Sequence, residues 1–106
     1  MKNYTLLFIL LAVCQVGLSQ SKTLEKANKL FANQAYAEAI EAYTAEEELD
    51  ADATLNLADA YYYIADAEKA VQYYDQAWEL NEGRSPEAHF RYADALKRNK
   101  DYDRAN

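Results

Sequence analysis

Apolar and small residues recur at helical spacing along most of this chain, and residues 51–80 show the pattern best. A first helical face in this stretch consists of Thr54, Leu57, Ala58, Tyr61 and Ile64. A second face consists of Ala67, Ala70, Val71, Tyr74, Ala77 and Trp78. Spacings of three, four and seven residues are typical of helices with one buried face. Because only Ala65 and Asp66 separate the two faces, the pattern predicts two helices packed antiparallel.

The same pattern predicts further helices on both sides of this pair. One helix is expected from about residue 21 to 33 and a second from about 36 to 48, with Asp50 or Asp52 capping the next one. Ser85 and Pro86 are expected to cap and open a fifth helix, because proline lacks an N–H that a first turn leaves unbonded. A sixth helix is expected to begin near Tyr102. The chain is therefore predicted to be all-α.

Three segments of the chain share four columns of residue types without a gap. The segments are residues 26–40, 57–71 and 92–106, which are offset by 31 and 35 positions. The columns are Ala27, Ala58 and Ala93; Leu30, Tyr61 and Leu96; Tyr36, Ala67 and Tyr102; and Ala39, Ala70 and Ala105. Small residues in two antiparallel helices let their backbones approach closely, and a large apolar residue one turn later fills the adjoining space. These columns therefore predict a repeated helix pair.

This pattern resembles the tetratricopeptide repeat family, whose period is about 34 residues. The resemblance covers residues 20–106 and implies a short right-handed solenoid of about two and a half repeats. The units would be residues 20–50, residues 51–85 and an incomplete unit at 86–106. Three features depart from the family pattern: a first loop about three residues short, alanine in the usual glycine column, and Ala51 and Glu82 in the proline column.

A looser resemblance concerns the segments LSQSK, KLFANQAYAEAIEAY, LADAYYYIADAEKAVQYYDQAW and PEAHFRYADALKRNKDYDRA. They are similar to the N-terminal repeat region of OmpA-like envelope proteins of Bacteroidetes-type bacteria, some of which are associated with type IX secretion. The interrupted third unit would leave Ala93 and Leu96 partly uncovered. We therefore expect either a fragment of a longer protein or an end that pairs with another molecule.

Residues 1–19 have the layout of a bacterial secretory signal peptide. A basic start with Lys2 precedes an unbroken apolar run, residues 6–13, and small residues precede a cut expected between Ser19 and Gln20. The run is much shorter than the roughly 20 residues of a membrane-spanning helix. Cys14 leaves a second possibility open, a lipoprotein signal with lipidation at this cysteine. Either way, we expect export to the periplasm or to the periplasmic side of the outer membrane.

Charge and composition argue against several classes of function. The net charge of the whole chain is −7, and it is −8 for residues 20–106 because Lys2 is the only charged residue before them. Such a surface repels phosphate backbones, so nucleic acid is not an expected partner. The chain has one histidine and one cysteine, and the acidic run around Glu46–Glu48 lacks the central glycine of a calcium loop. No catalytic residue, metal or cofactor is therefore expected.

The family resemblance implies a concave groove lined by the first helix of each pair. Its residues would be Asn28, Phe31, Leu55, Asp59, Tyr62, Tyr63, Phe90, Asp94, Lys97 and Arg98, with Leu24, Ala32, Asp52 and Glu87 beside them. Tyr61, Tyr74 and Trp78 are expected to pack in the core instead. Aromatic side chains mixed with acids suit a protein or peptide partner with basic and apolar side chains.

Two functions follow from these expectations. The first is a non-catalytic protein–protein interaction scaffold of the bacterial cell envelope. The alternative is a structural N-terminal spacer of a larger OmpA-like, peptidoglycan-associated outer-membrane protein, with the groove filled by a neighbouring domain.

Overall fold

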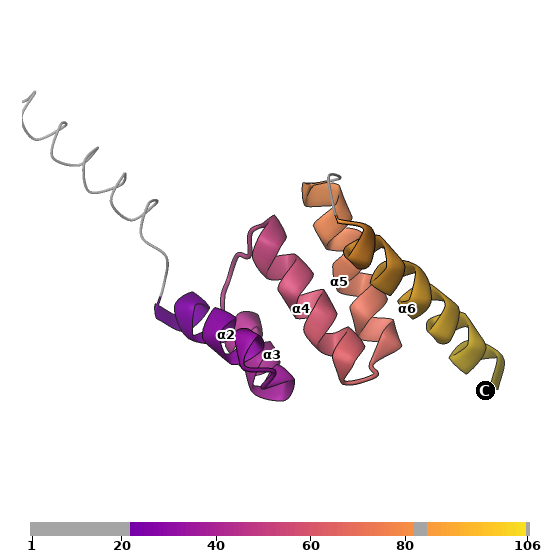
Figure 1. The fold of residues 1–106 in the computed structure, drawn as a ribbon, viewed down its shortest axis with the longest axis horizontal. Helices are drawn as coiled ribbons and strands as arrows, with labels where there is room; N and C mark the ends of the chain where they lie inside the picture. Colours follow the sequence, from indigo (N-terminus) through magenta and orange to yellow (C-terminus); the bar gives the residue numbers. More distant parts are fainter. Residues whose placement is uncertain (1–21, 82–84, 106) are drawn as a thin grey trace, which may run out of the picture.

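The computed structural model describes residues 22–81 and 85–105, with side chains described as far as Lys100 (Figure 1). Its five helices are α2 (Lys22–Ala32), α3 (Tyr36–Thr44), α4 (Ala51–Tyr63), α5 (Ala67–Leu80) and α6 (Pro86–Ala105). Consecutive helices pack against each other, and α4 also contacts both α2 and α6. The predicted all-α fold of antiparallel helices is confirmed. The predicted signal peptide, its cleavage point and Cys14 lie outside the described residues.

Fully buried alanines lie between the paired helices. Ala27 and Ala39 are fully buried between α2 and α3, and Ala58 and Ala70 are fully buried between α4 and α5. The absence of longer side chains at these four positions lets the backbones of each pair approach, as their columns in the sequence predict. Around them lie two apolar clusters, one with Tyr43 and Leu57 and one with Tyr74 and Ala95.

The two helix pairs turn in the same way. Gln34 and Ala65 have φ angles of 64° and 67°, and each stands at the same position of its pair. The next amide closes the turn, because Ala35 N donates to Leu30 O and Asp66 N to Tyr61 O, both at 2.9 Å. A left-handed non-glycine residue costs about 1–2 kcal/mol. Burial of the second helix offsets that cost in both pairs.

The third segment differs from the prediction, because α6 is one helix from Pro86 to Ala105 and no sixth helix begins near Tyr102. Lys100 occupies the position equivalent to Gln34 and Ala65. Reversal there would require Lys100 to adopt the left-handed conformation, at a cost of about 1–2 kcal/mol. A continuous helix keeps the backbone hydrogen bonds without the cost of a left-handed residue. As a result Ala93 is exposed and Leu96 is 41% exposed, which agrees with the uncovered face that the sequence predicts.

Helix ends follow local side-chain chemistry. The carboxylate of Asp50 accepts from Ala53 N at 2.8 Å, and Ser85 Oγ accepts from Ala88 N at 3.2 Å, so both expected caps are confirmed. In contrast, α3 ends at Thr44, four residues earlier than expected. Three consecutive glutamates, Glu46–Glu48, follow it, and negative charge is unfavourable at the C-terminal end of a helix dipole. The earlier ending lets Leu49 pack against the first apolar cluster.

Candidate functional site

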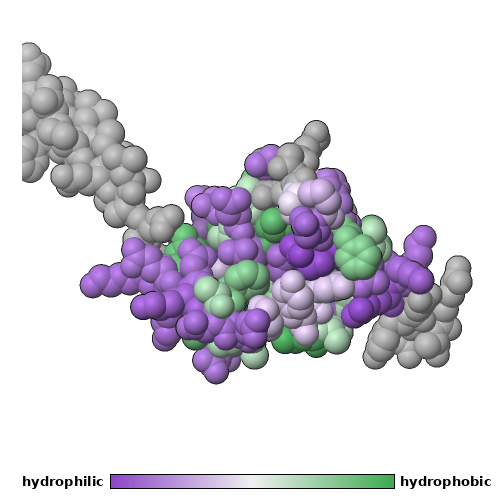
Figure 2. All heavy atoms as spheres, in the orientation of Figure 1, coloured by the Kyte–Doolittle hydropathy of each residue, from purple (hydrophilic) through white to green (hydrophobic). Residues whose placement is uncertain are grey.

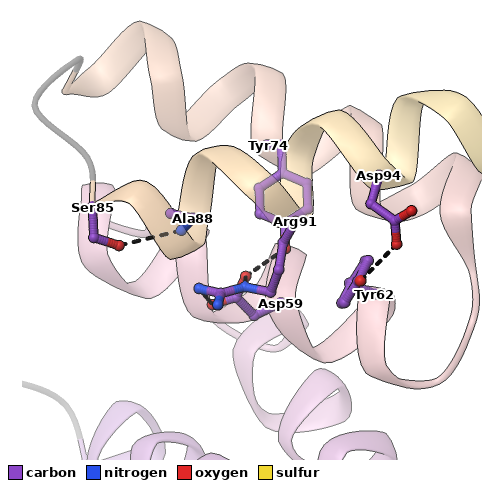
Figure 3. Close-up of polar contacts among 7 residues, drawn as sticks. All are labelled: Asp59, Tyr62, Tyr74, Ser85, Ala88, Arg91 and Asp94. Carbon is purple, nitrogen blue, oxygen red and sulfur yellow. Dashed lines mark hydrogen bonds and ion pairs between the residues drawn. The ribbon is translucent and has the colours of Figure 1, made fainter.

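A polar link of the same design connects each helix pair to the helix that follows. In the first pair, Tyr43 Oη donates to Asn28 Oδ1 at 2.6 Å, and Asn56 Nδ2 of α4 donates to Tyr43 Oη at 3.2 Å. In the second pair, Tyr74 Oη donates to Asp59 Oδ1 at 2.5 Å. The second link is completed from α6 by Arg91, whose Nε and Nη2 donate to the two carboxylate oxygens of Asp59 at 2.8 and 3.0 Å (Figure 3).

The members of the two links occupy equivalent positions. Asn28 and Asp59 are 31 residues apart, as are Tyr43 and Tyr74, and this equals the first offset between the similar sequence segments. Asn56 and Arg91 differ by the second offset, 35 residues. The second link is the charged version of the first, and burial together with the hydrogen bond to Asp59 raises the pKa of Tyr74 far above its usual value.

The burial of Asp59 corrects one groove prediction. This residue is only 5% exposed and its carboxylate is used by Tyr74 and Arg91, so it does not line an accessible groove. The reason is the position of Arg91, which reaches it from α6 across 32 residues of sequence. Two other predicted groove residues have structural contacts as well: Asn28 accepts a hydrogen bond from Tyr43, and Leu55 packs against the second apolar cluster.

A row of aromatic rings crosses α2, α3 and α4 on the side of the predicted groove. The rings of Phe31 and Tyr36 are 5.6 Å apart, those of Tyr36 and Tyr63 stack at 4.8 Å, and Tyr62 meets Tyr63 edge-on at 5.5 Å. Phe90 of α6 continues the row, because it lines the same hollow as Tyr62 and Tyr63. We call these five residues the aromatic strip.

The hollow lies between α4 and α6 and has a volume of about 440 Å³. It is lined by Tyr62, Tyr63, Pro86, Glu87, Phe90 and Arg91. Phe90 is 67% exposed and Tyr63 is 48% exposed, so two large apolar side chains face solvent here. The view in Figure 2 shows a mainly hydrophilic surface broken by separate apolar areas, one of them over α6. The hollow therefore combines exposed ring surface with charged groups at its wall.

Beside the hollow, three predicted groove residues contact one another. Tyr62 Oη donates to Asp94 Oδ2 at 2.7 Å, and this hydrogen bond raises the pKa of Tyr62 (Figure 3). Arg98 Nε lies 3.0 Å from the same carboxylate oxygen, and its guanidinium carbon lies 5.2 Å from the centre of the Tyr62 ring. The side chain of Arg98 is half-exposed, and Lys97 beside it is exposed.

The structure thus gathers half of the predicted groove residues, namely Tyr62, Tyr63, Phe90, Asp94 and Arg98, into one region of α4 and α6. Sequence reasoning missed Tyr36, Pro86 and Arg91. The sequence did single out Tyr36, which stands in the third column of the aligned segments, but its stacking on Tyr63 depends on how the two helix pairs pack together. Arg91 could have been found in a similar way, because it lies 35 residues after Asn56, at the equivalent position of the next segment.

The region offers the ring faces of Tyr62, Tyr63 and Phe90, the carboxylates of Glu87 and Asp94, and the guanidinium group of Arg98. Within residues 22–81 and 85–100, no group of three or more histidine, cysteine, aspartate or glutamate side chains is placed to hold a metal ion. None of the helices that the structure describes is long and apolar enough to cross a membrane.

Comparison of the chain with protein-family models, with curated proteins and with solved structures finds no match.

Proposed function

We propose that this chain is a non-catalytic interaction scaffold of tetratricopeptide-type helix pairs, and that its aromatic strip binds a peptide or a partner protein. The observation that carries the proposal is the hollow between α4 and α6, in which Tyr63 and Phe90 are exposed side by side with charged groups. Exposed aromatic residues on a rigid frame are typical anchors of protein interfaces.

The repeat assignment is supported by equivalent detail in the two complete pairs. Both have a pair of fully buried alanines, a left-handed residue at the turn, and a buried tyrosine that bonds to the first helix of its own pair. In each case the next helix supplies the third member of the polar link. A chance pairing of helices would not be expected to repeat the features within the pair at an offset of 31 residues and the third member of the link at the second offset, 35 residues.

The packing of the first helices supports the choice of binding face. α4 contacts both α2 and α6, so these three helices are neighbours although α3 and α5 separate them in the sequence. The strip runs across them, and the ion pair of Arg91 with Asp59 fixes α6 against α4 beneath the hollow. The binding surface is thereby held by packed helices, which lowers the entropy lost on binding.

The predicted signal peptide and the resemblance to envelope proteins favour a scaffold that is exported to the periplasm or to the periplasmic side of the outer membrane. Membrane association is proposed only through the envelope context or through lipidation at Cys14. Nucleic acid is not proposed as a partner, because the net charge of −7 opposes it.

One observation favours the alternative of a structural spacer in a larger OmpA-like protein. Ala93 and Leu96 give α6 a second apolar area, with Leu96 41% exposed, and an adjoining domain would cover it. A spacer of this kind requires no peptide binding at the aromatic strip, so the two functions make different predictions.

Selection from a displayed library of random 12-residue peptides separates them. The wild-type chain is compared with Tyr63→Ala/Phe90→Ala and with the matched control Leu80→Ala, which removes another exposed apolar side chain, from α5. Circular dichroism confirms that each variant is folded. A scaffold enriches the same peptides on the wild type and on Leu80→Ala but not on the double variant. Enrichment of the same peptides on all three proteins, or on none, contradicts the proposal.

A further inference from the structure

We infer that the hollow between α4 and α6 takes the side chain of an arginine from the bound partner. This inference rests on the proposed function, because it names the chemistry of the residue that the aromatic strip anchors. Tyr63 and Phe90 supply exposed rings to the hollow, and Glu87 in the first turn of α6 supplies a carboxylate. A guanidinium group is planar and always charged, stacks on aromatic faces and pairs with carboxylates.

The protein already holds one of its own arginines in this way on the adjoining surface. The guanidinium carbon of Arg98 lies 5.2 Å from the centre of the Tyr62 ring, and its Nε lies 3.0 Å from Asp94. Tyr62 lines the hollow too, and its ring meets Tyr63 edge-on. The same two kinds of group, ring and carboxylate, face the hollow from Tyr63, Phe90 and Glu87. A second guanidinium group therefore finds equivalent partners there.

The charge around the hollow favours a cation over an anion. Arg91 is part of the lining, but both carboxylate oxygens of Asp59 accept hydrogen bonds from its guanidinium group, which balances its charge. Residues 30–68 contain no lysine or arginine, and the whole chain has a net charge of −7. The resulting potential attracts positively charged segments and opposes acidic ones. An arginine suits the hollow better than a lysine because only its planar group can stack on the rings.

The test uses small probes and aromatic NMR signals of the full chain. N-acetyl-arginine methylamide is compared with its neutral analogue of the same shape, N-acetyl-citrulline methylamide, and with N-acetyl-glutamate methylamide. We expect the arginine probe to shift the ring signals of Tyr63 and Phe90 and to bind about fivefold more tightly than the citrulline probe. Glu87→Gln should abolish that difference. The matched control Glu79→Gln, at an exposed acid on α5, should preserve it.

Equal affinity for the arginine and citrulline probes overturns the inference, as does preference for the glutamate probe or a set of shifts that avoids Tyr63 and Phe90. Loss of the arginine preference in Glu79→Gln also overturns it, because the preference would then come from overall charge. The peptide selection judges the proposed function separately. Selected peptides that require the aromatic strip but lack a cationic residue would support the proposed function and overturn only the inference about arginine.

Discussion

The charged link between α4, α5 and α6 should contribute a large part of the stability of this protein. Asp59→Asn removes the negative charge but keeps an acceptor for Tyr74, since Asn28 already accepts from Tyr43 in the first pair. What is lost is the partner of Arg91, whose guanidinium group remains charged. The side chains of Arg91 and Asp59 are 20% and 7% exposed. The unpaired charge of Arg91 is therefore largely shielded from water.

The size of the effect follows from that burial. Removing one partner of a fully buried ion pair costs about 3–5 kcal/mol. Because Arg91 keeps some contact with water, we expect about 2–3 kcal/mol for Asp59→Asn. A folded unit of this length has a total stability of roughly 4–12 kcal/mol. The substitution should therefore lower the melting temperature by about 10–20 °C.

Urea unfolding followed by circular dichroism measures this loss, and a double-mutant cycle assigns it to the ion pair. Asp59→Asn/Arg91→Asn gives the second link the residue types of the first link, Asn28, Tyr43 and Asn56. We expect the double variant to be at least about 1 kcal/mol more stable than the sum of the single losses predicts. Additive losses, or an Asp59→Asn variant within about 0.5 kcal/mol of the wild type, would refute the reasoning.

Two further predictions concern the turns and the tyrosines. Ala65→Gly should stabilise the protein by about 0.5–1 kcal/mol, because glycine adopts the φ of 67° without strain. Ala60→Gly, inside α4, should instead destabilise it. Thermal unfolding compares the two variants, and a loss of stability in both would contradict the left-handed turn. Burial and the hydrogen bond to Asp75 raise the pKa of Tyr92 to about 12, so the unfolded chain loses this proton first, near pH 10. The stability from Tyr92 is therefore complete below about pH 10 and is lost as the pH rises towards 12. Absorbance at 295 nm should show one tyrosine fewer ionising near pH 12 in Tyr92→Phe than in the wild type, and loss of a tyrosine that ionises near pH 10 instead would count against the assignment.

Most of the helical framework is predictable from the sequence, because it depends on local periodicity. The alanine columns predict the buried residues Ala27, Ala39, Ala58 and Ala70, and the faces of α4 and α5 place Leu57 and Tyr74 in the core. Predictions near helix ends are less successful. Ile64 is 45% exposed although it fits the stripe of α4, because it is the last residue before the left-handed turn at Ala65.

The site is less predictable, because it depends on contacts between distant segments. Helical phase alone leaves Asp59 on an exposed face, whereas in the structure Tyr74 of α5 and Arg91 of α6 both contact its carboxylate. Similarly, nothing local to Tyr36 indicates that its ring stacks on Tyr63, which belongs to the next pair. The continuous α6 was not predicted, because Lys100 stands at the position equivalent to the turn residues Gln34 and Ala65.

The most direct test of the account is a map of where a selected peptide contacts the chain. An isotope-labelled protein is titrated with a synthetic copy of the most enriched library peptide while backbone and aromatic signals are recorded. We expect the largest shifts at Tyr62, Tyr63 and Phe90, with little change at Leu80 on α5. A map centred on α3 and α5, or on Leu96 of α6, would contradict the claim that the aromatic strip is the binding surface.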